Sequence, residues 1–398
     1  MKIDAAHDAG ALAGFRVIDL TTVLMAPLAT RMLADHGADV IRIEAPGGEA
    51  FLSTPPARSP GMNWFTLNLH RNKRSVVLDL KAAAGRDAAE ALMASADVVV
   101  TNMRQAALER LGLDAATMCA RHPRLVYCTG NGYGSDGPYA GKAAYDDAIQ
   151  AGSGLASLVE RVDGEPRYSP AVIADKVCGL HILQAVLAAL LFRERTGRGQ
   201  AIEVPMFETM VAFNLAEHHG GHIFEPPEGD VGYVRVLNRS RRPYRCADGW
   251  ICLLPYTDRN WRDFFGFVGR PALADDARFA EHTARIANSE TLYGLVGELA
   301  AEHTLAEWLE FCDRVSIPAT AVMDLADAPS DPHLAAVDLL GVLEHPTEGA
   351  YRMVRDPIRY EASPTSLRRH APRPGQHTRE VLAELGWDDD AIAQVTGA

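Results

Sequence analysis

The first 130 residues alternate between short apolar runs and longer helical stretches, and this alternation limits the fold more than any other feature of the chain. Phe15–Leu20 reads as a buried strand, Pro27–His36 as a helix with a proline in its first turn, and Ala38–Ile43 as the next strand. A strand, a helix and a strand in this order favour a parallel sheet with helices packed outside it. The alternation continues through strands at Ser75–Leu80, Asp97–Thr101 and Leu125–Thr129, and helices at Gly85–Ala94 and Ala106–Leu111.

The pattern changes after two further predicted helices, Ala144–Leu155 and Ala174–Arg195. The next segment is rich in Gly, Pro, Arg and His and has no clear periodicity, which is typical of a linker. Because 398 residues exceed the usual size of one domain, we predict a large Rossmann-like domain with an open parallel α/β sheet and a smaller α+β domain. The predicted boundaries are 1–216 for the first part of the large domain, 217–242 for the linker, 243–325 for the small domain, and 326–398 for a return linker and the C-terminal part of the large domain.

Charge and composition exclude several classes of function. A formal net charge of −13 argues against a nucleic-acid partner, because binding to phosphate backbones needs a broad basic face. The longest apolar stretch, Leu183–Phe192, is about half as long as a membrane span, and residues 1–14 lack the apolar core of a signal peptide. The six cysteines include no C-x-x-C pair, so neither a zinc site nor a redox motif is indicated. We therefore expect a cytoplasmic protein with reduced thiols and no membrane attachment.

The segment Gly130-Asn-Gly-Tyr-Gly134 follows the fifth predicted strand and resembles a dinucleotide-binding loop only weakly. The G-x-G-x-x-G fingerprint belongs at the first strand–helix turn, and here both the position and the spacing differ. The first such turn, Thr21–Pro27, contains no glycine. We therefore expect no permanently bound nucleotide cofactor, and we interpret the three glycines as positions that need positive φ angles.

Basic and polar residues follow several of the predicted strands. They occur in His70–Arg74, in Asn102–Arg104 and at Lys142. The carboxyl ends of parallel strands gather at one edge of a sheet, where open α/β folds bind their ligands. This recurrence of positive charge predicts an anionic ligand, such as one that bears phosphates.

Asp175 lies between an apolar run and a strongly apolar predicted helix. The position is typical of an acid that stabilises a helix N-terminus, although a carboxylate held in a pocket can also act as a nucleophile. Spacing alone favours the structural role. His218, His219 and His222 have no acidic cluster beside them, so we expect no metal site.

A set of short motifs recurs in order along nearly the whole chain. The set comprises Leu12–Leu20, Gly37–Glu44, Asn72–Ser75, Asn102–Arg104, Gly130–Gly134, Gly137–Tyr139, Ala144–Asp146, Ala174-Asp175, Arg195–Gln200 and Gly375–Thr378. In these motifs the chain resembles the class III CoA-transferases, a group that includes formyl-CoA transferase, crotonobetaine CoA-transferases and the related α-methylacyl-CoA racemase. No single motif is specific, but the ordered set is. At the closing motif, Gln376 stands where the family usually has glutamate.

The resemblance implies an enzyme that moves coenzyme A (CoA) from an acyl-CoA donor to a free carboxylic acid, with Asp175 as the covalent nucleophile. It also implies that CoA enters as a substrate, and that two chains form an interlocked homodimer of threaded rings. Motif matching places CoA contacts near Leu24, Met25, Lys73, Arg104 and Lys142, and contacts to the acyl group near Gly132, Tyr133 and Tyr145.

The chain departs from the family pattern in two features of the expected CoA site. Relatives often have an arginine after the position of Glu44, where it contacts the nucleotide end of CoA, and this chain has Ala45. Arg42 and Arg71 are the two candidates for a basic residue in its place. The glycine-rich lid of formyl-CoA transferase has no clear counterpart.

An acyl-CoA racemase or epimerase on the same fold is the open alternative. Such an enzyme needs an acid/base group on each face of the α-carbon. In the related racemase one group is an aspartate at the Asp175 position, and the other is a histidine where this chain has Tyr145. A tyrosine, with an ordinary pKa of about 10, is a poor base near neutral pH, so this substitution favours transfer.

Overall fold

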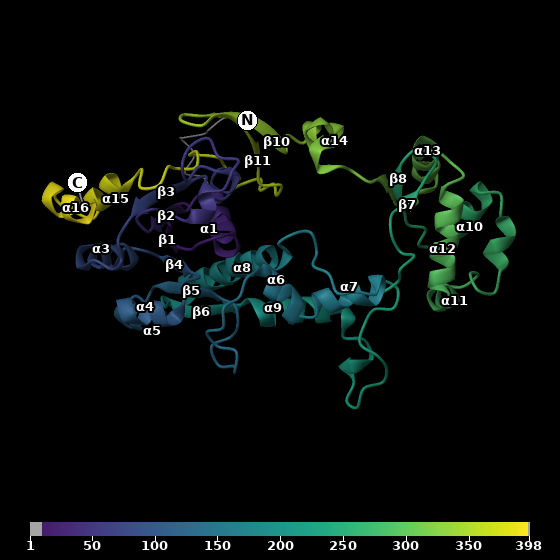
Figure 1. Cartoon of the computed structure of the whole chain (residues 1–398), viewed down its shortest axis with the longest axis horizontal. Helices are drawn as coiled ribbons and strands as arrows, with labels where there is room; N and C mark the ends of the chain where they lie inside the picture. Colours follow the sequence, from purple (N-terminus) through teal and green to yellow (C-terminus); the bar gives the residue numbers. More distant parts are fainter. Residues whose placement is uncertain (1–9, 397–398) are drawn as a thin grey trace. The chain divides into compact units, whose positions relative to one another are not determined.

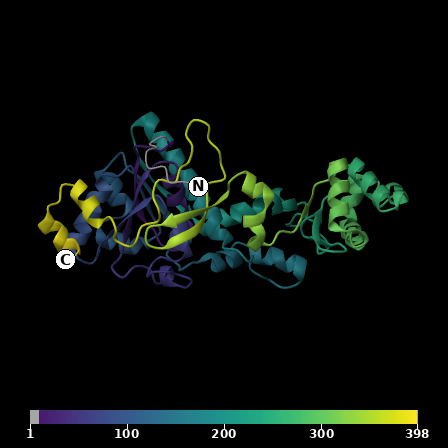
Figure 2. The ribbon, with the colours of Figure 1, turned by 90° about the horizontal axis from the view of Figure 1, so that it is seen from above.

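The computed structural model describes residues 10–396, which form two compact units. The large unit contains residues up to 153, residues 169–212 and residues from 332 onward, and the small unit contains residues 154–168 and 213–331. The chain thus leaves the large unit and returns to it. Figure 2 shows the returning C-terminal helices (yellow) beside the blue ribbon of the N-terminal segment, with which they share a buried apolar cluster.

The large unit is built on a six-stranded sheet in which every neighbouring pair of strands is parallel. The strand order is β3-β2-β1-β4-β5-β6, which is the order of doubly wound sheets that bind nucleotides. The predicted α/β class with a parallel sheet is therefore confirmed. The strands are β1 (Arg16–Leu20), β2 (Asp39–Glu44), β3 (Lys73–Val77), β4 (Val98–Thr101), β5 (Val126–Asn131) and β6 (Gln200–Pro205).

Helices cover both faces of this sheet (Figure 1). On one face, apolar side chains of β1 to β5 form a buried cluster with α3, α4, α5, α15 and α16. On the other face, α1 and α8 pack on each other and on the sheet. The helices of the large unit are α1 (Met25–Asp35), α2 (Trp64–Leu69), α3 (Ala83–Ala94), α4 (Gln105–Leu111), α5 (Ala115–Arg121), α6 (Asp146–Gly152), α8 (Ile173–Thr196), α14 (Pro332–Ala336), α15 (Thr378–Glu384) and α16 (Asp389–Thr396), with the hairpin β10 (Leu340–His345) and β11 (Gly349–Val354); α9 (Met206–His218) begins in this unit.

Helix α8 packs closely on α1 because Gly179 has no side chain at the contact. A Cβ at this position would lie 2.6 Å from the carbonyl oxygen of Met25. In length and composition α8 could also cross a membrane, with a mean hydropathy of 1.6, so the expectation that no segment reaches that length was wrong. Apolar core helices of proteins without a membrane span meet the same criterion.

Two elements differ from the sequence-based prediction. The helix expected at Ala144–Leu155 is divided into α6 and α7 (Leu155–Asp163), because Gly154 adopts a φ of +91° between them. Strand β6 was not predicted. It lies at the edge of the sheet with half of its residues exposed, and therefore lacks the apolar pattern of a buried strand.

The small unit has an aromatic core of its own around a three-stranded antiparallel sheet. Phe264 stacks on Trp308 with ring centroids 5.5 Å apart, and Phe267 stacks on Phe311 at 4.0 Å. Besides α7, its elements are β7 (Tyr244–Arg245), β8 (Trp250–Leu253), β9 (Ala319–Ala321), α10 (Asp258–Phe267), α11 (His282–Ala287), α12 (Ser289–Ala300) and α13 (Leu305–Val315).

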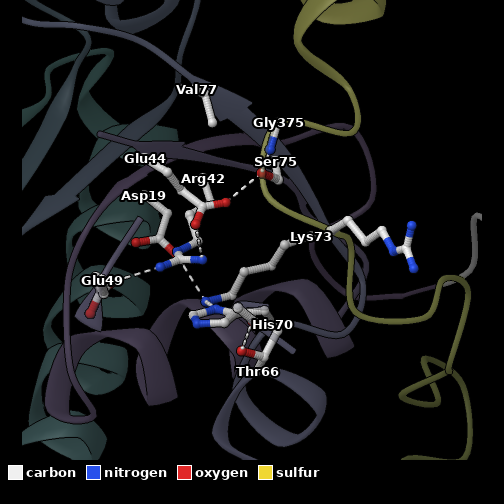
Figure 3. A network of polar contacts seen from close by, with 12 residues as sticks. Asp19, Arg42, Glu44, Glu49, Thr66, His70, Lys73, Ser75, Val77 and Gly375 are labelled. Carbon is white, nitrogen blue, oxygen red and sulfur yellow. Dashed lines mark hydrogen bonds and ion pairs between the residues drawn. The ribbon is translucent and has the colours of Figure 1, made fainter. Parts of the chain in front are cut away.

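A fully buried ion pair joins three elements of the large unit (Figure 3). The ammonium of Lys73, at the start of β3, lies 2.8 Å from the Asp19 carboxylate of β1. It also donates to Thr30 Oγ1 of α1 at 2.8 Å, and it lies 3.2 Å from His70 Nδ1. Although burial alone would raise the pKa of Asp19, Lys73 holds it below its ordinary value. Burial lowers the pKa of Lys73 to about 8, so both groups are charged at neutral pH.

A second buried network lies beside this pair and extends to the first strand–helix turn (Figure 3). Arg42 of β2 donates to Glu44 at 2.7 Å and also pairs with Glu49. The other oxygen of Glu49 accepts the backbone N–H of Val23 at 3.0 Å. Val23 has a φ of +67°, which a β-branched residue rarely adopts. The two charged networks therefore support the turn from which α1 begins.

We predict that Lys73→Met lowers the free energy of unfolding by about 3–5 kcal/mol, because it leaves the Asp19 carboxylate buried and unpaired. Urea unfolding at pH 7 measures the loss. The matched control is Arg121→Met, which removes the cation of the exposed pair with Glu90 and should change stability little. Equal effects of the two substitutions would contradict the importance of the buried pair.

Candidate functional site

The candidate site lies at the carboxyl edge of the parallel sheet, where the order of strands reverses direction between β1 and β4. The loops after these two strands are joined by reciprocal hydrogen bonds. The Thr22 N–H donates to Asn102 Oδ1 and the Asn102 amide donates to the Thr22 carbonyl, both at 2.9 Å. Leu24 and Met25 then begin α1, and Arg104 precedes α4. Three of the predicted CoA-contacting positions thus share this edge.

The loop after β5 packs against these residues without bulky side chains. A Cβ at Gly130 would lie 2.7 Å from Met25 Cε, and one at Gly132 would lie 2.5 Å from the Cβ of Ala144. The expectation that Gly130, Gly132 and Gly134 need positive φ angles was wrong, because none of the three is in that conformation. At Gly132 the Cβ of Ala144 leaves no room for a side chain, and at Gly130 and Gly134 the ends of the Met25 and Glu208 side chains occupy that space.

Three aromatic rings surround the same loop. Tyr133 packs edge-on against Tyr139 at 5.5 Å and lies 5.5 Å from Phe207 of α9. The Lys142 ammonium sits over the Tyr139 ring, 3.8 Å from its centroid. Lys142 is exposed, so this cation–π contact holds a positive charge at the rim of the site.

Asp175 lies in the first turn of α8 and is half-buried. Its backbone N–H donates to Asp146 Oδ1 of α6 at 3.0 Å. Burial and, second to it, the negative charge of Asp146 together raise the pKa of the Asp175 carboxyl from 3.8 to about 7. A carboxyl of this kind is partly ionised at neutral pH and is a stronger nucleophile than an ordinary aspartate.

The structure places most of the other predicted site residues at the edge of the sheet and one of them, Lys73, in the interior. Leu24, Met25, Gly132 and Tyr133 lie in the packed strand-end loops, and Tyr145 precedes α6 with its side chain 73% exposed. Arg104 is exposed, and its guanidinium makes no ion pair with any residue from 10 to 396. Lys73 differs, because its ammonium is fully buried and is engaged by Asp19 rather than facing the edge.

Neither arginine considered as a substitute for the basic residue missing at Ala45 is free. Arg42 pairs with Glu44 and Glu49, and Arg71 pairs with Asp35 at 2.7 Å. Both guanidiniums are buried. In the described part of the chain, no three His, Cys, Asp or Glu side chains are grouped so that they could hold a metal ion.

Sequence reasoning missed the residues that surround Asp175. Asp146 was quoted only as part of a motif, and Gln150 was not considered. Gln150 Nε2 donates to Asp146 Oδ2 at 2.6 Å, and both side chains are buried. Their spacing of four residues in a predicted helix was the signal that could have identified the pair.

Comparison with known proteins shows the family of the chain. Residues 12–378 match the model of CoA-transferase family III. The chain belongs to CoA-transferase family III. It is 33% identical over 388 residues to a succinate–glutarate CoA-transferase of Agrobacterium fabrum, covering 94% of this chain and 95% of that one. It is 32% identical to a formyl-CoA:oxalate CoA-transferase of Streptomyces avermitilis, with coverage of 96% and 97%.

Solved structures show the same relationship. A CAIB/BAIF family protein from Brucella suis superposes with a TM-score of 0.81 at 29% identity, covering 95% of this chain and all of that one. This family III CoA-transferase is therefore an enzyme that moves CoA between CoA thioesters and carboxylic acids, by the covalent aspartyl chemistry general to the family.

We predict that Asp175→Asn stabilises the enzyme above neutral pH. Since the pKa of Asp175 rises from 3.8 to about 7 on folding, the folded state binds its proton more tightly, and stability falls as the pH rises between these values. The penalty reaches the order of 2–4 kcal/mol above pH 7 for a half-buried group. Urea unfolding at pH 5 and pH 8 should show a gain for the variant that is larger at pH 8.

Asp114→Asn is the control, for which we expect a loss of stability instead of a gain. Asp114 caps α5 and accepts from Thr117, which lowers the pKa of Asp114 although burial opposes this. Asp114→Asn should destabilise the protein over the same pH range, because the asparagine keeps an acceptor for the Thr117 N–H but loses the one for the Thr117 hydroxyl. A gain for Asp175→Asn that is independent of pH would contradict the raised pKa.

Proposed function

We propose that Asp175 is the nucleophile of this CoA-transferase and that its substrates are an acyl-CoA and a small free carboxylic acid. The observation that supports the proposal most strongly is the placement of Asp175, half-buried in the first turn of α8 with its backbone N–H held by Asp146. Relatives named for succinate, glutarate and oxalate make short dicarboxylic acids the first candidates for both acyl groups.

The reaction proceeds by four exchanges at carbonyl carbons. The Asp175 carboxylate attacks the donor thioester, the C–S bond breaks, and CoA leaves as a thiolate from a mixed anhydride. The thiolate attacks the aspartyl carbonyl, which releases the donor acid and leaves an aspartyl-CoA thioester. The acceptor carboxylate displaces CoA to form a second mixed anhydride. The thiolate then attacks the acceptor's carbonyl, which yields the new acyl-CoA and restores Asp175.

Two backbone donors in the glycine loop are suited to the tetrahedral intermediates. The N–H groups of Gly132 and Tyr133 donate to no group within residues 10–396, and both residues are partly exposed. The N–H groups of Gly134 and Ser135 differ, because they already donate to Glu208 and Glu203. We assign Gly132 and Tyr133 to the developing oxyanion, where preorganised donors contribute most.

The charged rim suits the CoA nucleotide. Arg104 and Lys142 are exposed cations on loops after β4 and β5, and we assign them to its phosphates. Leu24 and Met25 provide the backbone and apolar surface at the start of α1. For Lys73 we propose support of that turn through Asp19 and Thr30, because its ammonium is buried.

We also propose a cytoplasmic homodimer of interlocked rings. Several apolar side chains of α8 are exposed on the single chain: Leu180, Leu187, Leu191 and Phe192. Exposed apolar surface of this extent marks an interface. All six cysteines are unpaired thiols, as in reducing compartments.

We predict that Asp175→Ala lowers the rate of CoA transfer by at least about 1000-fold, because no other group can form the covalent intermediate. The assay measures exchange of CoA from succinyl-CoA to glutarate or oxalate by mass spectrometry. Asp147→Ala, which removes an exposed acid of α6, is the matched control and should retain activity.

Two results would contradict this function. One is retention of more than a few per cent of the rate by both Asp175→Ala and Asp175→Asn. The other is rapid α-deuteration of a 2-methylacyl-CoA in deuterium oxide without an acceptor, lost in Tyr145→Phe, which would identify a racemase. The phenol of Tyr145 is exposed, and Lys142, a cation close to it in sequence, lies over the Tyr139 ring instead.

We predict that the protein sediments as a dimer even at nanomolar concentration, because threaded rings cannot separate without unfolding. Analytical ultracentrifugation with fluorescence detection is the measurement. Leu191→Asp, on the exposed face of α8, should lower the yield of folded dimer. Arg121→Asp changes an exposed side chain of α5 and should leave the yield unchanged. A monomer at nanomolar concentration would overturn the interlocked arrangement.

A further inference from the structure

The first turn of α8 lacks the usual side-chain cap. Its N-cap residue is Val172, which cannot accept a hydrogen bond, and no side chain of α8 itself caps the helix. The acceptor comes instead from another helix, since Asp146 of α6 receives the backbone N–H of Asp175 at 3.0 Å. A carboxylate at a helix N-terminus also favours the helix dipole. Asp146 therefore holds the peptide unit that carries Asp175.

Gln150 fixes the orientation of Asp146 in turn. Its Nε2 donates to Asp146 Oδ2 at 2.6 Å and to the carbonyl of Ala171 at 3.2 Å. Its Oε1 accepts the backbone N–H of Ser169 at 2.9 Å. Gln150 is 1% exposed and Asp146 is 6% exposed, so the chain of hydrogen bonds is sheltered from water. These bonds tie the segment before α8 and its first turn to one face of α6.

The arrangement places two acidic groups together in a sheltered site, which a purely structural cap would not require. An asparagine or serine caps a helix as well as an aspartate does. Aspartate adds a negative charge next to a second carboxyl, and this disfavours ionisation of Asp175. The raised pKa makes Asp175 harder to ionise, but a carboxyl of higher pKa is the better nucleophile once it is ionised.

Among the described residues on the surrounding elements, no other charged group raises the pKa of Asp175. On α8 itself, Lys176 is exposed, and the thiol of Cys178 stays neutral because burial raises its pKa to about 12. Asp147, next to Asp146, is exposed. The charged side chains on α1, β6 and the start of α9 have partners of their own. On α1, Arg31 donates to Asp35. Glu203 of β6 accepts from Asn131 and Ser135, and Glu208 of α9 accepts the Gly134 N–H.

We propose that Asp146 and Gln150 are positioning residues that hold the first turn of α8 in place and, through the charge of Asp146, tune the reactivity of Asp175. This inference rests on the proposed role of Asp175 as nucleophile. It assigns two separable effects to one side chain. The geometry of Asp146 sets the rate, and its charge sets the pH at which Asp175 becomes ionised.

The test compares kcat/KM against pH for the wild type, Asp146→Asn and Asp146→Glu. The acidic limb of this profile reports ionisation of the free enzyme. Asp146→Asn keeps the acceptor for the Asp175 N–H but removes the charge and the bond from Gln150 Nε2, so the limb should move to lower pH by about one unit. Asp146→Glu keeps the charge, so its limb should stay near that of the wild type while kcat falls.

Asp114→Asn is the matched control, because Asp114 is another buried helix cap of the large unit and lies on α5, outside the site. It should leave the limb unmoved. An unmoved limb in folded Asp146→Asn overturns the inference, as does an equal shift in Asp114→Asn.

A second measurement separates this inference from the proposed function. Infrared difference spectra of wild type against Asp175→Asn report the protonated carboxyl of Asp175 directly, without turnover. If the wild type transfers no CoA but the carboxyl still titrates at lower pH in Asp146→Asn, then the function is wrong and the coupling of the two acids stands. If transfer occurs and the titration is unchanged, only the coupling is wrong.

Discussion

The ion pair between Lys73 and Asp19 is the interaction on which the arrangement of the large unit depends most. It joins β1, β3 and α1 at a point with no access to water, so each charge is stable only in the presence of the other. Asp19 also accepts from Thr21 and Thr30, which lie on either side of the first strand–helix turn. The pair therefore defines where β1 ends and how α1 begins.

The neighbouring network extends the same constraint toward solvent. Glu49 holds Val23 in a conformation that the residue would not adopt alone, and Asn102 ties the adjacent Thr22 to the loop after β4. Rigid support of this kind is what a site needs if it must bind a long, flexible ligand with little loss of entropy. On the other side of the same turn, Met25 meets the glycine loop that follows β5.

The environment of Asp175 shows the opposite balance, since it lowers the stability of the fold instead of raising it. A carboxyl beside another acid, in a half-buried position, lowers stability at neutral pH. The surrounding fold tolerates this because α8 is held along its length by α1 and the sheet. Such local costs are typical of sites that carry chemistry rather than structure.

The sequence by itself determined the class of fold and the family, because strand–helix alternation and an ordered set of motifs are local properties of the chain. Through the resemblance to the family it also predicts Asp175 as the nucleophile, and it places basic residues on the loops after the strands. It did not reveal β6, whose side chains lie at a sheet edge, or the reason for the three glycines after β5, which depends on the neighbours Met25, Ala144 and Glu208. Only the tertiary structure decided that Lys73 is buried while Lys142 is exposed, and that Asp146 and Gln150 hold Asp175. The physical reason is that burial and pairing are set by residues far away in the chain, and a sequence pattern records the kind of side chain but not what surrounds it.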